Sequence, residues 1–261
     1  MTQADGAPEA RPARRGQGSD LRVEGLAKRF GGLQVFEDLS FTLDPAEILG
    51  VIGPNGAGKT TLINVICGRL SPTGGRVFLG GKDVTGFPLH SLSRMGVVRS
   101  FQQTNVFKSA TVRENVSRAI RFSEGMAARW GELEDLLRDF ELGPRLDEQS
   151  DNLPYGLQKM LGLLLAYATR PKVLLLDEPA AGLERKERTR VDDFVHYAQA
   201  THGCSVLIVE HDMELIRRLC PRIMVLDAGK VLAEGPPEVV LARRAVIDAY
   251  VGATEETAGP C

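Results

Sequence analysis

One run of eight residues in the first quarter of the chain has the residue types and the spacing that a bound triphosphate requires. Glycine residues let a backbone curl so that successive N–H groups point inward at an anion. Within the run, Lys59 supplies a positive charge for the β- and γ-phosphates, and the Thr60 hydroxyl is a hard oxygen ligand for Mg²⁺. The run fits the phosphate-binding loop (P-loop) pattern G-x-x-x-x-G-K-[ST] without a mismatch, and its members are Gly53, Pro54, Asn55, Gly56, Ala57, Gly58, Lys59 and Thr60.

The segments on either side of this run have the patterns that such a site needs. Ile48 to Ile52 form a continuous apolar stretch typical of a buried strand, and the residues from Thr61 to Ile66 have the pattern of a helix. A helix that begins at the phosphates adds a partial positive charge from its N-terminus, so we include Thr61 in the predicted site. This context favours a nucleotide site over an ordinary glycine-rich turn.

A second run places two carboxylates at the end of an apolar stretch, Val173 to Leu176. Asp177 has the chemistry to hold Mg²⁺ on the side opposite the P-loop, usually through water. Glu178 follows directly and can polarise the water that attacks the γ-phosphate, as a general base. Adjacent acids also occur in solvated turns, but their combination with the P-loop favours the hydrolytic interpretation.

A third apolar stretch, Val206 to Val209, is followed by Glu210 and His211. A histidine at the end of a strand can bridge a γ-phosphate oxygen and a catalytic carboxylate. An isolated histidine more often lies at the surface or caps a helix. The order of the three motifs along the chain favours a catalytic role for His211.

Apolar patterns between the motifs predict the elements that position them. Apolar residues alternate with polar ones from Leu21 to Leu43, which indicates half-buried antiparallel strands with a turn at Gly31-Gly32. Later apolar stretches are continuous, as expected for strands buried on both faces of a parallel sheet, and helical segments separate them. The stretch from about 87 to 170 is helical in character. We therefore predict an α/β fold with a mainly parallel core sheet, an antiparallel β subdomain and an inserted helical subdomain.

Composition limits the class of protein. The chain has 261 residues, enough for one large domain or two small ones, and 43 % of them are hydrophobic. Charged residues make up 25 % and the formal net charge is -2, so the basic surface of a nucleic-acid-binding protein is not expected. The four cysteines lack metal-ligand spacing, and we interpret them as reduced thiols of a cytoplasmic protein.

Neither a membrane span nor a signal peptide is predicted. The longest apolar stretch, Met160 to Ala168, is far shorter than the roughly 20 residues that a bilayer helix needs. The N-terminus lacks the charged-then-apolar order of a signal peptide. We predict a disordered tail over residues 1–19, a single domain over residues 20–252 and a flexible tail over residues 253–261.

Taken together, the motifs resemble the nucleotide-binding subunit of an ATP-binding cassette (ABC) transporter, from Leu21 to about Gly252. The resemblance implies a P-loop NTPase (RecA-like) core that binds ATP and Mg²⁺ and hydrolyses ATP to ADP and phosphate. It implies that Phe30 stacks on adenine, and that Gln102 reaches Mg²⁺ and the attacking water. The catalytic set implied is Glu178, His211, Gln102 and Lys59, with Thr60, Gln102 and Asp177 around the metal. The segment called the D-loop matches at Gly182, Leu183 and Glu184, where many members have Asp in place of Glu184.

A narrower resemblance points to importers of branched-chain and other hydrophobic amino acids, and to the larger of their two ATPase subunits. It implies a second ATPase subunit, two transmembrane permease subunits and, indirectly, a solute-binding protein as partners, at the cytoplasmic face of the membrane. Importers of urea and short amides have similar ATPases, so the solute stays open. The runs that carry this resemblance are Arg94 to Gln102, Thr111 to Val116, Asp177 to Leu183, Glu210 to Met213 and Ile247 to Gly252.

One segment departs from the family pattern. The signature segment usually reads close to Leu-Ser-Gly-Gly-Gln, and in the family it reaches across a dimer to the γ-phosphate bound by the other subunit. Pro154 removes the serine hydroxyl and one N–H donor. Hydrogen bonds to a charged group are worth about 1.5–3 kcal/mol each, so the contact in trans should be weaker. The segment here consists of Leu153, Pro154, Tyr155, Gly156, Leu157 and Gln158.

Two interpretations of this departure follow. In the one we favour, the chain pairs with a different ATPase, whose intact signature faces Lys59, Glu178 and His211 of this chain. In the other, backbone donors of the variant signature suffice. Two further classes have less support. A soluble ABC ATPase of DNA repair or translation usually carries coiled-coil insertions or two cassettes, and a regulatory module that does not hydrolyse ATP would not need Glu178 and His211.

Overall fold

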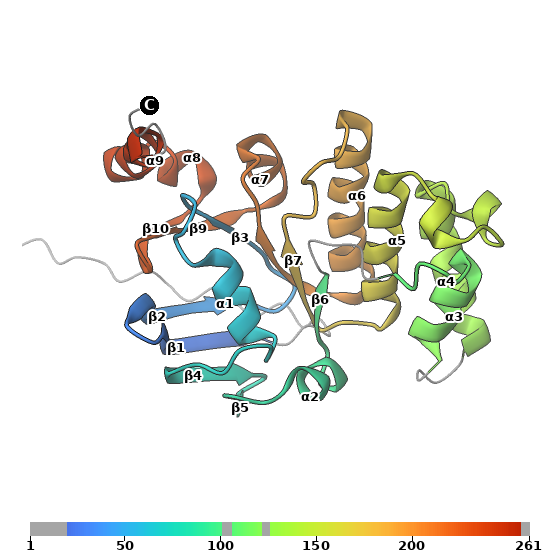
Figure 1. The fold of residues 1–261 in the computed structure, drawn as a ribbon, viewed down its shortest axis with the longest axis horizontal. Coiled ribbons are helices and arrows are strands. Elements are labelled where there is room, and N and C mark those ends of the chain that lie inside the picture. The colour runs from blue at the N-terminus through green and yellow to red at the C-terminus, as the bar shows by residue number, and fades with distance from the viewer. Residues whose placement is uncertain (1–19, 101–105, 122–125, 257–261) are drawn as a thin grey trace, which may run out of the picture.

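The computed structural model describes residues 20–100, 106–121 and 126–256. Its strands and helices alternate in the second half of the chain, as the apolar pattern predicts (Figure 1). The strands are β1 (Leu21–Phe30), β2 (Leu33–Leu43), β3 (Ile48–Ile52), β4 (Gly74–Leu79), β5 (Lys82–Asp83), β6 (Val97–Ser100), β7 (Val173–Asp177), β8 (Ser205–Val209), β9 (Arg222–Asp227) and β10 (Lys230–Gly235). The helices are α1 (Lys59–Ile66), α2 (Leu89–Arg94), α3 (Val112–Ile120), α4 (Met126–Asp139), α5 (Tyr155–Ala168), α6 (Arg185–His202), α7 (Met213–Leu219), α8 (Pro237–Val240) and α9 (Arg244–Glu256), with short 3₁₀ helices η1 (Gly143–Arg145) and η2 (Ser150–Asn152).

A six-stranded sheet forms the centre of the molecule, in the order β10-β9-β3-β8-β7-β6. Five of these strands are parallel, and β10 pairs with β9 in the antiparallel direction. Every residue of β3, β7 and β8 is buried, because helices or a second sheet cover both faces. The prediction of a mainly parallel α/β core is confirmed.

The second sheet is antiparallel, with the order β2-β1-β4-β5. Leu21, Val23 and Leu26 of β1 are buried, while residues between them are only partly buried, which accounts for the alternating pattern in the sequence. The turn predicted at Gly31-Gly32 joins β1 to β2. This sheet therefore forms the predicted antiparallel β subdomain.

The two faces of the central sheet enclose two separate hydrophobic clusters. On one face, Leu49 and Val51 of β3 pack with α1 and the antiparallel sheet. On the other face, Ile48 and Ile52 of the same strand pack with α5, α6 and the helical region. Alternate residues of one strand point to opposite faces, so α1 and α5 are held on opposite sides of the sheet.

Two boundaries differ from the sequence-based expectation. The predicted helical range of about 87–170 includes β6, which pairs with β7 as the edge strand of the central sheet. An isolated short apolar stretch inside a helical region carries too little periodicity to be recognised as a strand. At the other end, α9 extends to Glu256, into the segment predicted as a flexible tail.

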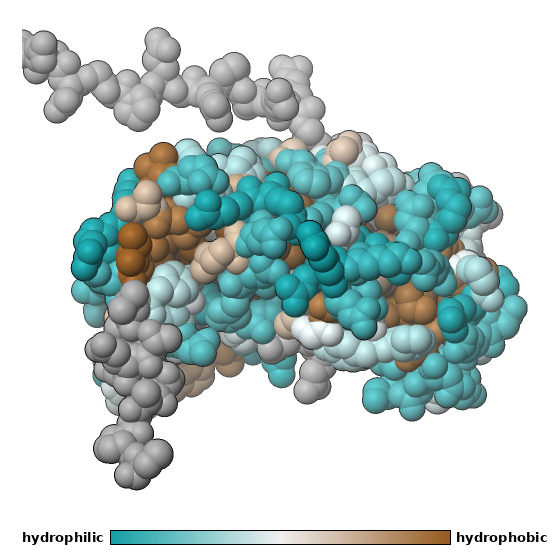
Figure 2. All heavy atoms as spheres, turned by 90° about the horizontal axis from the view of Figure 1, so that it is seen from above, coloured by the Kyte–Doolittle hydropathy of each residue, from teal (hydrophilic) through white to brown (hydrophobic). Residues whose placement is uncertain are grey.

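Within the described part of the chain, no helix combines the length and the apolar character needed to cross a bilayer. Figure 2 shows a mainly hydrophilic face, with small, separate hydrophobic patches. One of these patches lies at the end of the molecule that carries α8 and α9. The exposed large hydrophobic residues include Val239 of α8 and Ile247 of α9.

Candidate functional site

The P-loop connects the buried end of β3 to the start of α1. Gly58 is the N-cap of α1, with φ +98, and no side chain caps the helix or adds an acidic residue to its first turn. The N-terminal N–H groups of α1 are therefore left to an outside acceptor. Gly53 has φ +148, and a Cβ atom there would lie 2.0 Å from the Leu226 carbonyl oxygen. Only glycine lets this part of the loop pass so close to β9.

We expect Gly53→Ala to weaken ATP binding. The added methyl group must push the loop away from Leu226, and displacing one N–H donor from a charged phosphate costs about 1.5–3 kcal/mol. Gly32→Ala is the matched control, because a Cβ atom at this turn meets no atom within 4 Å. Titration with a fluorescent ATP analogue would test this, and equal affinity of both variants would contradict the expected result.

Lys59 lies folded against its own loop. Its Nζ atom donates hydrogen bonds to the carbonyl oxygens of Gly53, at 2.6 Å, and Pro54, at 2.9 Å. Burial lowers the pKa of Lys59, although Glu178 and Asp177 oppose this effect through their charges. The ammonium group is thus close to both carboxylates that the sequence predicts for the hydrolytic site.

Asp177 is buried at the C-terminal end of β7 and forms an ion pair with Arg99. The distance from Arg99 Nη2 to Asp177 Oδ2 is 2.7 Å, and the two side chains are only 4 % and 1 % exposed. The second guanidinium nitrogen of Arg99 donates to Asn64 of α1. Burial raises the pKa of Asp177, and Arg99 counteracts that rise. The sequence analysis assigned no role to Arg99. The feature that could have revealed one is a cationic residue inside an apolar strand, because a buried cation requires a buried anion as its partner.

The surroundings of Asp177 fit a hydrated divalent cation. The Oδ1 atom of Asp177 is buried and has no hydrogen-bond partner within the described ranges. Hydrogen bonding by the Thr60 hydroxyl to this carboxyl group lowers its pKa. A carboxylate oxygen and a threonine hydroxyl are hard ligands of the kind that Mg²⁺ prefers. Gln102, the third predicted ligand, lies outside the described residues.

Glu178 and His211 meet at the ends of neighbouring strands. His211 Nε2 lies 2.9 Å from Glu178 Oε1, and both side chains are partly exposed. Glu178 adopts the left-handed backbone conformation, with φ +49, and its N–H donates to the Val209 carbonyl oxygen at 2.8 Å. A non-glycine residue pays a steric cost for this conformation, so surrounding contacts must hold it. The two residues that the sequence predicts as a catalytic pair are brought together.

Phe30, the predicted adenine contact, is the last residue of β1 and is 45 % exposed. Leu33 faces it across the β1–β2 hairpin and is also exposed. The Nζ atom of Lys28 lies 4.7 Å from the centre of the Phe30 ring and donates to the Ser71 carbonyl oxygen. The exposed aromatic ring of Phe30 has the surface that a stacked base needs.

The signature segment and the D-loop contact each other. Pro154 is the N-cap of α5, one position before Tyr155, the first residue of the helix. A Cβ atom on Gly182 would lie 3.1 Å from the Tyr155 ring, and one on Gly156 would overlap the carboxylate of Glu187. These glycines allow close packing of the two segments. Since α1 and α5 lie on opposite faces of the sheet, the fold does not place the signature of one chain at its own P-loop (Figure 1).

Glu184 begins α6 as its N-cap and shares a capping box with Glu187. Its backbone N–H donates to Glu187 Oε2 at 2.9 Å. Arg188, one turn into the helix, donates to the Leu183 carbonyl oxygen and pairs with Asp212, the N-cap of α7. The D-loop is therefore tied to the segment that carries His211.

Comparison with known proteins agrees with this geometry. A sequence profile of the family described as "ABC transporter" matches residues 36–181. The chain belongs to the ABC transporter family. This confirms the resemblance stated from the motifs, and members of the family with this domain are ATPases.

Relatives and solved structures of the family extend over most of the chain. The protein is 37 % identical to the high-affinity branched-chain amino acid transport ATP-binding protein LivG of Escherichia coli, covering 89 % of this chain and 97 % of that protein. It is also 37 % identical to the corresponding protein BraF of Pseudomonas aeruginosa, with the same coverage. Its fold resembles the ADP conformation of MJ1267, an ATP-binding cassette of an ABC transporter, with a TM-score of 0.79, 28 % identity and coverage of 90 % and 99 %.

Proposed function

We propose that this ABC ATPase powers the uptake of branched-chain or related amino acids through a membrane permease. The observation that carries its hydrolytic role is the contact of Glu178 with His211, at 2.9 Å, beside the buried Asp177. The relatives named for branched-chain amino acid transport, which match the chain over most of its length, support the choice of solute class.

ATP is held by residues of the P-loop and by Phe30. Lys59 moves from its own loop carbonyls to the β- and γ-phosphates, and Phe30 stacks on the adenine. Thr60, Asp177 and Gln102 are the residues that would hold Mg²⁺. Bound Mg²⁺ would neutralise charge on the phosphates. The N–H groups at the start of α1 donate hydrogen bonds to the phosphate oxygens.

Glu178 orients and deprotonates the water that attacks the γ-phosphate in line. Its contact with His211 fixes the direction of the carboxylate, and His211 and Lys59 stabilise charge that develops on the phosphate. Glu178 and His211 follow the ends of neighbouring strands, where the scaffold is rigid, so this pair is preorganised before nucleotide binds.

A second ATPase subunit completes the site. Because α1 and α5 lie on opposite faces of the sheet, the γ-phosphate at the P-loop needs a signature from another chain. In this chain, the variant segment Pro154–Gln158 offers backbone N–H groups at the start of α5 and no serine hydroxyl. We favour a heterodimer in which the partner brings the intact signature, over a homodimer that relies on backbone donors.

Closing and reopening of the dimer then drive two transmembrane permease subunits, which receive solute from a solute-binding protein. The ATPase acts as a single domain over residues 20–252, peripheral to the cytoplasmic face of the membrane. Movement of the helical region carries the force to the permease, and no residue of this chain contacts the solute. Nucleic acid has no part in this function.

Affinity purification of a tagged chain from detergent-solubilised native membranes, followed by mass spectrometry, tests the assembly. We expect two multi-span permeases, a second ATPase with a Leu-Ser-Gly-Gly signature and a solute-binding protein. Recovery of the chain alone, or with soluble factors, would oppose the transporter assignment. The recovered binding protein can be screened with amino acids, urea and amides to identify the solute.

The proposed heterodimer predicts how the rate of ATP hydrolysis depends on the second ATPase. ATP hydrolysis by the purified chain should be slow, and adding the second ATPase should raise the rate, because its signature completes the active site. The measurement is steady-state phosphate release at increasing ATP concentration. Strong cooperative hydrolysis by this chain alone, unchanged by the partner, would favour the homodimer.

A further inference from the structure

The turn from Glu178 to Ala181 determines where the catalytic carboxylate points. Glu178 has φ +49, a conformation that its own backbone disfavours. Within the turn, the Ala181 N–H donates to the Glu178 carbonyl oxygen at 3.2 Å. The turn therefore needs support from outside to keep Glu178 against His211.

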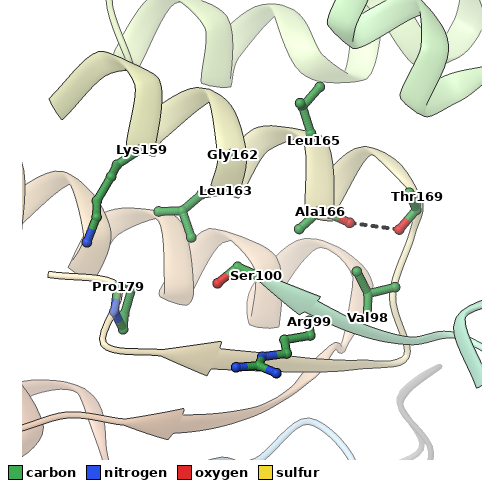
Figure 3. A pocket seen from close by; sticks show the side chains of 10 residues that line it. All are labelled: Val98, Arg99, Ser100, Lys159, Gly162, Leu163, Leu165, Ala166, Thr169 and Pro179. Carbon is green, nitrogen blue, oxygen red and sulfur yellow. Dashed lines mark hydrogen bonds between the residues drawn. The ribbon is translucent and has the colours of Figure 1, made fainter. Parts of the chain in front are cut away.

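Lys159 of α5 supplies support on the carbonyl side. The residue is only 7 % exposed, and its Nζ atom donates to the Ala181 carbonyl oxygen at 2.7 Å and to the Glu178 carbonyl oxygen at 3.3 Å. Figure 3 shows the Lys159 side chain extending from α5 toward Pro179, along the edge of a cavity of about 210 Å³. A buried ammonium group that binds two carbonyl oxygens fixes both ends of the turn.

Glu210, at the end of β8, supplies support on the amide side. It is 3 % exposed, and its Oε1 atom accepts from the Ala180 N–H at 2.8 Å. The Oε2 atom accepts from the His211 N–H at 3.1 Å. One carboxylate thus contacts the backbone of both segments that carry the catalytic pair.

We propose that Lys159 and Glu210 are positioning residues that clamp the 178–181 turn between opposite charges and so hold Glu178 and His211 in their catalytic geometry. The inference rests on the proposed hydrolytic role of these two residues. Carbonyl oxygens of the turn point toward the Lys159 ammonium group, and the Ala180 N–H points toward the Glu210 carboxylate. The peptide dipoles of the turn are therefore oriented favourably between the two charges in a buried environment.

The charges of the clamp support each other. Burial lowers the pKa of Lys159, and the negative charges of Glu210 and Glu178 counteract that effect. Burial raises the pKa of Glu210, and backbone N–H donors of Ala180, His211 and Asp212 counteract it. Removing one charge leaves the other buried with less compensation, so neither residue should be replaceable on its own.

The clamp also connects two parts of the ATPase cycle. Lys159 lies one turn into α5, the helix that begins with the signature segment, and its partners are in the loop before the D-loop. A displacement of α5 relative to the central sheet pulls directly on the carbonyl oxygen of Glu178. The position of the catalytic carboxylate is thereby made dependent on the signature helix.

Hydrogen–deuterium exchange of the full chain tests the clamp without any need for hydrolysis. In Lys159→Met, peptides covering 177–183 and 210–212 should exchange about tenfold faster, because the turn opens locally, while peptides from β1 and β2 keep their rates. Lys186→Met is the matched control, since this exposed lysine forms a surface ion pair with Glu141. Unchanged exchange at 177–183 in Lys159→Met would overturn the proposal, whether or not the wild-type chain hydrolyses ATP.

ATPase kinetics of the assembled transporter give the second readout. For Lys159→Met and Glu210→Gln we expect kcat to fall by about 10²-fold, with KM and ATP affinity changed less than about threefold, because only the catalytic pair is displaced. Lys159→Arg keeps the donor and should recover part of the rate. A kcat equal to wild type in both variants, or a parallel loss of ATP affinity, would refute the clamp. An inactive wild-type complex would instead count against the proposed function, and exchange would still decide the clamp.

Discussion

Glu178→Gln is expected to reduce kcat for ATP hydrolysis by about 10²- to 10⁴-fold and to leave ATP binding intact. Glutamine has the size of glutamate and can still hydrogen-bond to His211, but its amide cannot accept a proton from water. The P-loop, Phe30 and Asp177 keep their own side chains in this variant, so ATP should still bind. Steady-state phosphate release and equilibrium binding of ATP measure the two effects separately.

Glu214→Gln provides the control for this experiment. Glu214 lies in the first turn of α7, three residues after His211, and its exposed carboxylate pairs with Arg218. A surface pair of this kind contributes little, so the variant should hydrolyse ATP at the wild-type rate. If Glu178→Gln retained more than about a tenth of the wild-type kcat, general-base catalysis by this residue would be refuted.

Much of this site could be predicted because its motifs combine local residue types with strongly apolar strands. The continuous apolar stretches at β3, β7 and β8 are buried strands in the structure, and each ends at a segment that the sequence marks for chemistry. A strand buried on both faces is apolar over most of its length, so it is visible in the sequence without knowledge of its neighbours.

The supporting residues could not be predicted in the same way. Arg99 and Asp177 are 78 positions apart, and Lys159 and Ala181 are 22 positions apart. Such contacts depend on how α5 packs on the central sheet and on the place of β6 at its edge, which no local pattern records. A buried charge inside an apolar segment does indicate that a partner exists, but it does not identify that partner. The same limitation hid β6, whose four residues are too few to show a period.

Arg99→Leu is expected to destabilise the protein by about 3–5 kcal/mol, because it leaves the buried carboxylate of Asp177 without its counter-charge. Urea denaturation followed by circular dichroism measures the loss. Arg113→Leu is the matched control, since Arg113 forms an exposed ion pair with Asp147 and should cost less than about 1 kcal/mol. Replacing both Arg99 and Asp177 by leucine should recover much of the stability, because no buried charge remains.

The pH dependence of this loss distinguishes a buried charge from a simple loss of packing. Burial raises the pKa of Asp177 and Arg99 lowers it, so in Arg99→Leu the pKa of this carboxyl group rises further above its unfolded value. Such a group destabilises the folded state when it is ionised. The penalty begins to fall as the pH drops below the folded pKa and is gone below the unfolded pKa. The difference in stability between Arg99→Leu and wild type should therefore shrink as the pH is lowered. If the stability difference between Arg99→Leu and wild type stayed constant with pH, the arginine would stabilise β6 by packing of its side chain. Groups other than Arg99 would then stabilise the ionised carboxylate of Asp177.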